Sequence, residues 1–137
     1  MASRKIEDLR PDLQPVALEF LRRCTALEVN GVDIIFTCTY RSNDEQAALY
    51  ASGRTKPGPI LTHAEPGVSA HNFTLNGKPA ARAFDYGVIV NGKYDAQGVH
   101  PAWAQAGRIA MELGLNWYGK PGAKFREMPH CELKKGA

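Results

Sequence analysis

The stretch "RAFDYGVIV", residues 82–90, carries the pattern on which the predicted sheet depends. It is rich in aromatic and β-branched residues, which predicts a buried strand. Alternation along a strand puts Phe84, Tyr86 and Val88 on one face and Asp85 on the other. A carboxylate in so apolar a strand is costly unless it is paired or bound to a cation. The stretch therefore predicts a core strand that also carries a functional acid.

The segments on both sides of this strand alternate between helical and extended patterns. Asn91-Gly92 directly after it is a typical hairpin turn. Ser42 and Glu45 form a capping box at the start of a short helix. The predicted elements are a helix over 15–28, a strand over 32–40, a helix from Ser42 to Gly53, a loop over 54–82 with a small hairpin at Asn76-Gly77, the strand over 82–90, a helix over 100–114, and short strands at 115–118 and 130–133, the last two separated by a loop over 119–129.

Length and composition favour a single soluble α+β domain over residues 1–137. The sequence leaves open whether residues 1–6 are ordered. With 44% hydrophobic and 23% charged residues, the chain can bury a core without needing a metal to fold. A net charge of +3 is too small to indicate a nucleic-acid partner. We expect a monomer.

The N-terminal residues lack an apolar run of signal-peptide length, and no stretch is apolar enough to span a bilayer. We therefore expect synthesis in the cytoplasm and no stable membrane insertion. Three widely spaced cysteines, Cys24, Cys38 and Cys131, favour reduced, partly buried thiols over a disulfide framework.

The segment "FREMPHCEL", residues 125–133, places acids and a histidine close to the end of the chain. Strand alternation puts His130 and Glu132 on one face, and Cys131 and Leu133 on the other. The spacing from Glu127 to His130 suggests a base beside a metal ligand. A short acidic tail strand is the alternative.

His71, Asp85 and His130 would supply zinc with three protein ligands and leave a fourth position for water, which is typical of catalytic sites. Glu127 could then act as a base. In the alternative interpretation, Asp85 pairs with Arg41 or Arg82, and His130 is an ordinary half-buried strand histidine. His63 is interpreted as a solvated loop residue rather than a substitute ligand.

Three blocks in order, "TYRSNDEQAALYASGR", "SAHN…GKPAARAFDYGV" and "EMPHCEL", cover about residues 36–133. They resemble the zinc D-alanyl-D-alanine carboxypeptidase and L-alanyl-D-glutamate endopeptidase superfamily, including phage endolysins of the latter type. The resemblance implies a small α+β domain, of the type shared with hedgehog signalling proteins, with helices packed against a central antiparallel sheet that carries the zinc.

Position by position, the resemblance implies that His71, Asp85 and His130 bind Zn²⁺ and that Glu127 is the general base and then the general acid. Arg41 would stabilise the oxyanion or hold a substrate carboxylate. Ser69 and Gln46 match positions near the cleft. Glu132, on the His130 face, could orient that ligand or lie at the surface.

One departure from the family pattern is the spacing between His71 and Asp85. Thirteen residues, 72–84, lie between them here, whereas many members have six. The stretch "FTLNGKPA" contains the Asn-Gly turn of a hairpin, so it can loop out without separating the ligands. We expect it at the mouth of the cleft, where it would affect specificity more than metal binding.

The resemblance implies a zinc peptidase that cuts the stem peptide of peptidoglycan at L-alanyl-D-glutamate and acts as a lytic enzyme of a phage with a thin-walled host. It would wait in the host cytoplasm until a holin released it to the periplasm. A D-alanyl-D-alanine carboxypeptidase or dipeptidase is the nearest alternative. A non-catalytic, zinc-stabilised binding module is the alternative of another class.

Overall fold

The computed structural model describes residues 2–122 and 126–136. Of the loop predicted over 119–129, residues 123–125 lie outside the described residues. The elements are η1 (Ile6–Asp8), α1 (Gln14–Cys24), η2 (Thr25–Asn30), β1 (Val32–Cys38), α2 (Asn43–Ala51), η3 (Ala70–Asn72), β2 (Thr74–Leu75), β3 (Lys78–Pro79), β4 (Ala83–Val90), β5 (Lys93–Tyr94), α3 (Ala102–Glu112), β6 (Asn116–Trp117) and β7 (His130–Glu132).

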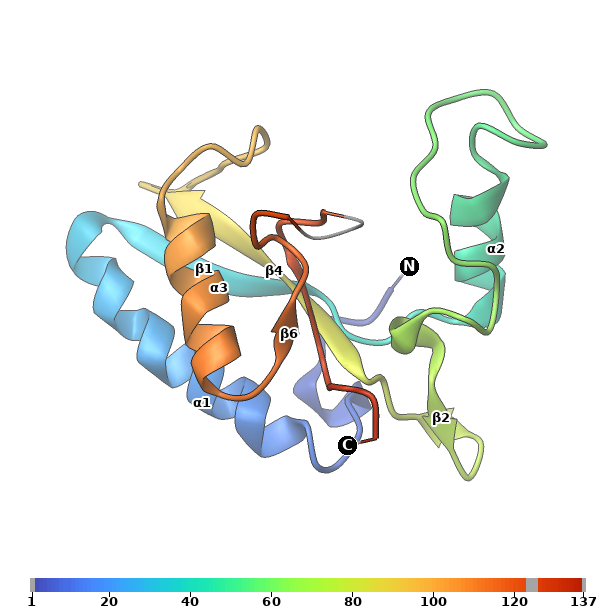
Figure 1. Ribbon diagram of the computed structural model, residues 1–137, viewed down its shortest axis with the longest axis horizontal. Coiled ribbons are helices and arrows are strands. Elements are labelled where there is room, and N and C mark those ends of the chain that lie inside the picture. The colour runs from blue at the N-terminus through green and yellow to red at the C-terminus, as the bar shows by residue number, and fades with distance from the viewer. Residues whose placement is uncertain (1, 123–125, 137) are drawn as a thin grey trace.

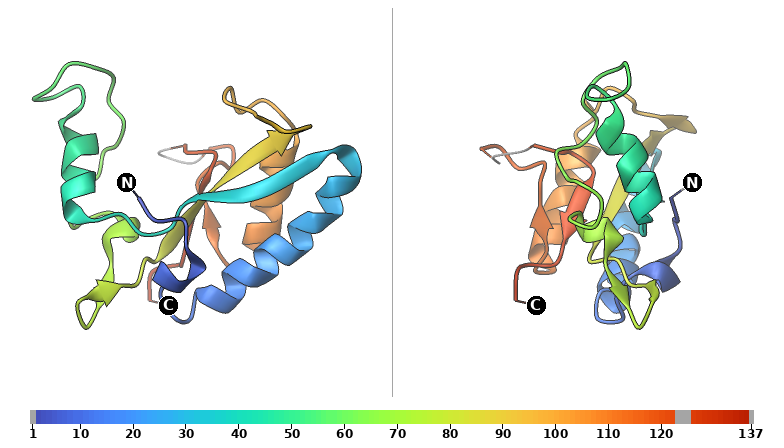
Figure 2. Two further views of the ribbon diagram at one scale, coloured as in Figure 1. Left: turned by 180° about the vertical axis from the view of Figure 1, so that it is seen from behind. Right: turned by 90° about the vertical axis from the view of Figure 1, so that its right-hand side faces the viewer.

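The main sheet is antiparallel and is built around β4, the strand that holds Asp85. Its order is β1-β4-β7-β6, and β5 pairs with β4 beyond the hairpin turn. Helices α1 and α3 pack beside this sheet, whereas α2 and the β2–β3 hairpin lie away from them (Figure 1). Figure 2 shows from two further sides that α2 and the loop after it stand apart from the α1–α3 layer. The expected α+β fold with a central antiparallel sheet is confirmed.

One face of β4 forms the core, as its alternation predicts. Phe84, Tyr86 and Val88 are fully buried. The ring of Phe20 from α1 lies 5.1 Å from that of Phe84, and Trp103 from α3 lies 5.5 Å from Tyr86. Both helices therefore cover the same face of the sheet, and the Asp85 face remains available for a site.

Both Asn-Gly hairpins are confirmed. Asn76 and Gly77 have φ values of 53° and 74°, and Asn91 and Gly92 have 50° and 82°. Two successive left-handed residues match the twist of a two-residue hairpin, and asparagine and glycine adopt this conformation most readily.

Several predicted elements are shorter in the structure, and for two of them the local structure gives a reason. The helix predicted over 15–28 changes to the tighter η2 after Cys24, where the Thr25 hydroxyl donates to the Arg22 carbonyl at 2.6 Å. The strand predicted over 32–40 ends at Cys38, after a β-bulge. Beyond that point Thr39 and Tyr40 exchange backbone hydrogen bonds with Ser3 instead of with β4, which the local pattern could not indicate.

Candidate metal centre and active site

The site is built across one rung of the sheet. In the register of the strands, Cys38 of β1 lies opposite Asp85 of β4, and Asp85 lies opposite His130 of β7. His71 comes from the short turn η3, where the Ser69 hydroxyl accepts a hydrogen bond from its backbone N–H at 3.2 Å. Residues far apart in the sequence are thus placed together by strand pairing and by a capped turn.

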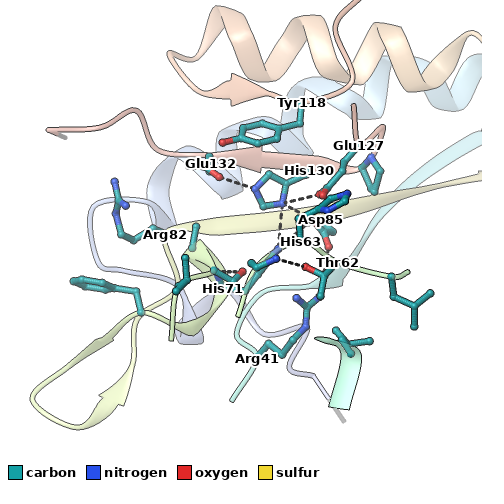
Figure 3. A pocket seen from close by; sticks show the side chains of 18 of the residues that line it. Arg41, Thr62, His63, His71, Arg82, Asp85, Tyr118, Glu127, His130 and Glu132 are labelled. Carbon is teal, nitrogen blue, oxygen red and sulfur yellow. Dashed lines mark hydrogen bonds and ion pairs between the residues drawn. The ribbon is translucent and has the colours of Figure 1, made fainter. Parts of the chain in front are cut away.

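The three predicted ligands converge through one atom each (Figure 3). Asp85 Oδ1 is 3.2 Å from His71 Nε2 and 3.1 Å from His130 Nδ1, and the two nitrogens are 3.3 Å apart. Donor atoms about 2.0–2.1 Å from a tetrahedral zinc ion would be separated by about 3.3–3.4 Å. The donor set therefore fits a small tetrahedral cation.

The outer nitrogen of each imidazole is held by an acceptor. His71 Nδ1 lies 2.8 Å from the Thr39 carbonyl oxygen, which can only accept, so this nitrogen carries a proton. His130 Nε2 donates to Glu132 at 2.8 Å. In their neutral forms both rings consequently direct a lone pair towards Asp85, and a cation is the natural partner of three such groups.

In the metal-free site the pKa values of His71 and Asp85 are shifted by their mutual attraction. Burial alone would lower the pKa of His71, but the Asp85 carboxylate beside it outweighs burial and raises that pKa to about 10. Burial opposes ionisation of Asp85, yet the two histidines hold its pKa well below the usual range. Without a metal, a proton on a histidine balances the carboxylate, so metal and proton compete for the same position.

The Cys38 thiol is a neighbour that the sequence did not bring into the site. Cys38, His71 and Asp85 form a possible metal-binding group, with ligand atoms within 4.8 Å of one another. Cys38 Sγ lies 3.6 Å from His71 Nδ1, the nitrogen that the Thr39 carbonyl occupies. Cys38 therefore adjoins the outer side of His71, whereas His130 adjoins its inner nitrogen.

Glu127 lies beside the three converging atoms without joining them. Its Oε2 is 3.9 Å from His130 Nδ1, and its side chain is 49% exposed, whereas that of His130 is 9% exposed. An exposed carboxylate next to a buried donor set can exchange a proton with a molecule bound in the cleft.

In the part of the chain that the structure describes, Arg41 is the lysine or arginine within ion-pair distance of the donor set. Its Nη2 lies 4.0 Å from Asp85 Oδ2, and its Nη1 donates to Gln46 Oε1 at 2.9 Å. Gln46 is fully buried and in turn donates to the Ala64 carbonyl at 2.9 Å, which connects α2 to the loop above the cleft. Gln46 thus holds the Arg41 guanidinium in place. The alternative in which Asp85 merely pairs with an arginine does not account for the two histidines.

A cleft of about 750 Å³ opens over this site. It is lined by all the sequence-predicted site residues except Gln46, which is fully buried and accepts a hydrogen bond from Arg41. Arg82 and Lys135 also line the cleft, which no sequence pattern indicated, and His63 borders it without joining the converging atoms. From the insertion over 72–84, Phe73 and Arg82 are the residues that line the described part of the cleft; the strands of the hairpin do not.

Fold and donor set together define a small α+β domain with a candidate metal site on one face of an antiparallel sheet. The chain is 36% identical over 124 residues to the peptidoglycan L-alanyl-D-glutamate endopeptidase CwlK of Bacillus subtilis, covering 89% of this chain and 74% of that protein. The fold of this chain is similar to that of the L-Ala D-Glu endopeptidase ChiX of Serratia marcescens. The TM-score is 0.59 and the identity 20%, over 98% of this chain and 89% of the other. No family model matches the chain.

The chain therefore belongs to the family of peptidoglycan L-alanyl-D-glutamate endopeptidases, and the resemblance found in the three sequence blocks is confirmed. It is a peptidase by that membership. In the described part of the chain, no helix combines the length and the apolar character needed to cross a membrane.

Proposed function

We propose that the chain is a zinc-dependent peptidase that hydrolyses the L-alanyl–D-glutamate bond of the peptidoglycan stem peptide. The observation that carries this proposal is the convergence of His71 Nε2, Asp85 Oδ1 and His130 Nδ1 within 3.1–3.3 Å of one another. The choice of bond is supported by the activity named for CwlK. The choice of zinc is supported by the donor set, because two imidazoles and one carboxylate suit zinc best among the common metals.

In this proposal His71, Asp85 and His130 hold the zinc, and Cys38 does not. When bound there, zinc would acidify a water molecule and polarise the substrate carbonyl. Glu132 keeps the inner nitrogen of His130 free of a proton by accepting from its outer nitrogen. The Thr39 carbonyl does the same for His71.

Glu127 is the proposed general base. Its carboxylate takes a proton from the attacking water and later gives it to the departing amino group of D-glutamate, so that its own charge is restored at the end of the cycle. Its position next to His130 and its exposure to the cleft support both steps.

Arg41 is the proposed donor to the substrate carbonyl oxygen, which gains negative charge as the water attacks. Gln46 fixes its guanidinium beforehand, so little reorganisation is needed when the charge develops. Ser69 supports the site indirectly by capping the turn that presents His71.

We further propose that residues 1–137 act as one monomeric domain in lysis, reaching the wall from the periplasm after a holin opens the inner membrane of a phage-infected cell. Membership in a family of wall peptidases supports the site of action. Expression of the chain in bacteria, with and without a co-expressed holin, tests the release route. The turbidity of the culture should fall only when the chain and the holin are present together. Light scattering of the purified protein gives its oligomeric state.

A digest of purified peptidoglycan tests the proposed bond and metal. New N-terminal D-glutamate, found by mass spectrometry, lost with a chelator and restored by zinc, is the expected result. Release of D-alanine would instead identify a carboxypeptidase. No cleavage by a folded, zinc-loaded protein would identify a binding module. Glycan strands without stem peptides serve as the negative control.

A further inference from the structure

We propose that Arg82 binds the free carboxylate of the D-glutamyl residue beside the scissile bond and thereby selects the acid over its amide. This inference rests on the proposed function. Glutamate has two carboxyl groups, and only one can continue the peptide, so the other remains as an anion next to the bond that is cut. Binding such a substrate requires a basic side chain in the cleft whose hydrogen-bond donors are not already used by the protein.

The backbone of Arg82 is fixed between the two segments that carry the histidines. Its N–H donates to the Ala70 carbonyl at 2.9 Å, one residue before His71. Its own carbonyl accepts from the Leu133 N–H at 2.9 Å, directly after β7. Arg82 thus keeps a set position relative to both imidazoles, as a specificity residue must.

The side chain of Arg82 lines the cleft, and its guanidinium is uncommitted. Among residues 2–122 and 126–136 the guanidinium makes no hydrogen bond. Its positive charge acts on the Glu132 carboxylate and helps to lower the pKa of that group. The Glu132 carboxylate is already occupied by His130 Nε2 at 2.8 Å. With respect to the described residues, all five N–H donors of Arg82 are therefore available for a ligand, and a planar guanidinium matches a carboxylate with two parallel hydrogen bonds.

Arg41 does not suit this role equally well. Its guanidinium already donates to Gln46 at 2.9 Å and lies 4.0 Å from Asp85. Figure 3 shows Arg41 and Arg82 on different sides of His71. We assign Arg41 to the reacting carbonyl and Arg82 to the substrate carboxylate, with Lys135 adding positive charge to the lining of the cleft.

The experiment compares two synthetic L-alanyl-D-glutamyl peptides that differ at one group. The chain continues through one carboxyl of D-glutamate, and the other is either free or a primary amide. The wild-type, zinc-loaded enzyme should cleave the acid with a kcat/KM about 10- to 100-fold higher, the range of charge-assisted hydrogen bonds to one group. Arg82→Gln should bring this ratio close to one, mainly by slowing cleavage of the acid. Arg82→Lys, which keeps the charge and loses the fork, should give an intermediate ratio.

Arg108→Gln is the matched control, because it removes the same charge from an exposed position on α3 that does not line this cleft. It should leave the ratio unchanged.

If Arg82→Gln lowers both rates equally and preserves the ratio, Arg82 acts only through Glu132 and the inference is wrong. If Arg82→Gln fails to fold, the wild-type ratio is measured against salt: it should fall as ionic strength rises, and a constant ratio would overturn the inference. A wild-type enzyme that cleaves both peptides equally also overturns it but retains the proposed function, whereas one that cleaves neither refutes both.

Discussion

His71 and His130 face each other through the nitrogens that do not donate outwards, 3.3 Å apart. Thr39 and Glu132 hold the opposite nitrogens at 2.8 Å each. Two neutral imidazoles would not place their lone pairs together beside a carboxylate unless a cation or a proton lay between them. The site is therefore prepared for a metal, and the proton that replaces the metal has measurable consequences.

Zinc affinity should rise with pH, because the metal must displace the proton held by the metal-free site. The pKa of His71 is raised from 6.5 to about 10 by Asp85. Below about pH 10 the metal-free histidine is protonated, so the apparent affinity should increase about tenfold per pH unit and level off above pH 10. Calorimetry in buffers of different ionisation enthalpy should detect about one proton released per zinc at pH 7.5. Zinc binding without proton release would contradict the assignment.

Glu127→Gln should retain zinc and lose turnover. The amide keeps the shape of the side chain, but it cannot take a proton from water, and general acid–base groups typically contribute about 10²–10⁴-fold to the rate. Because Glu127 Oε2 is 3.9 Å from His130 Nδ1, it lies outside the converging atoms and its loss should not release the metal. Bound zinc and kcat measured on the same preparation check both statements. A variant with unchanged kcat would remove Glu127 from the role of base.

Glu132→Ala should weaken zinc binding by about 10- to 100-fold, the usual effect of removing a carboxylate that orients a ligating histidine. Without this acceptor, the proton of His130 can move to Nδ1 and block the inner lone pair. Competition with a chromophoric chelator measures the change. Glu132→Gln is the informative control, since its amide oxygen can still accept from Nε2 and should restore most of the affinity. Equal losses in both variants would mean that the charge, rather than the hydrogen bond, matters.

Arg41→Lys separates the two roles that the sequence left open for this residue. A donor to the developing oxyanion acts mainly in the transition state, so its loss should lower kcat, by about 10²-fold or more. A group that only holds a substrate carboxylate would instead raise KM. Since Gln46 fixes the guanidinium at 2.9 Å, the shorter and more mobile lysine head group should not reproduce its position. Initial rates over a range of substrate concentrations distinguish the two outcomes.

Strand alternation is local, so the sequence alone predicted the faces of the strands, whereas the set of His71, Asp85 and His130 followed mainly from the resemblance of the three blocks. The side of β4 that carries Asp85, and the side of β7 that carries His130 and Glu132, followed from a period of two. The residues that surround the site could not be predicted in this way. Cys38 reaches Asp85 only through strand pairing and a bulge in β1, and Arg82 is placed by hydrogen bonds to Ala70 and Leu133. Such positions depend on pairing between distant segments, which no local pattern encodes.

Gly107→Ala should destabilise the fold although alanine is the better helix former. A Cβ atom on Gly107 of α3 would overlap the buried ring of Trp117 in β6, whose nearest atoms lie closer to that position than van der Waals contact allows. Overpacking typically costs about 1–3 kcal/mol, and for so deep an overlap with a buried ring we expect a cost above the gain of about 1 kcal/mol from replacing a helical glycine. Trp117 Nε1 also donates to the Met128 carbonyl at 2.8 Å, beside Glu127, so a displaced ring should lower activity as well as stability. Urea unfolding of zinc-loaded wild type and variant measures the first effect, and kcat below the unfolding transition measures the second. A variant stabilised by about 1 kcal/mol would instead show that Trp117 can move aside without loss, and that α3 and β6 pack less tightly than their contact implies.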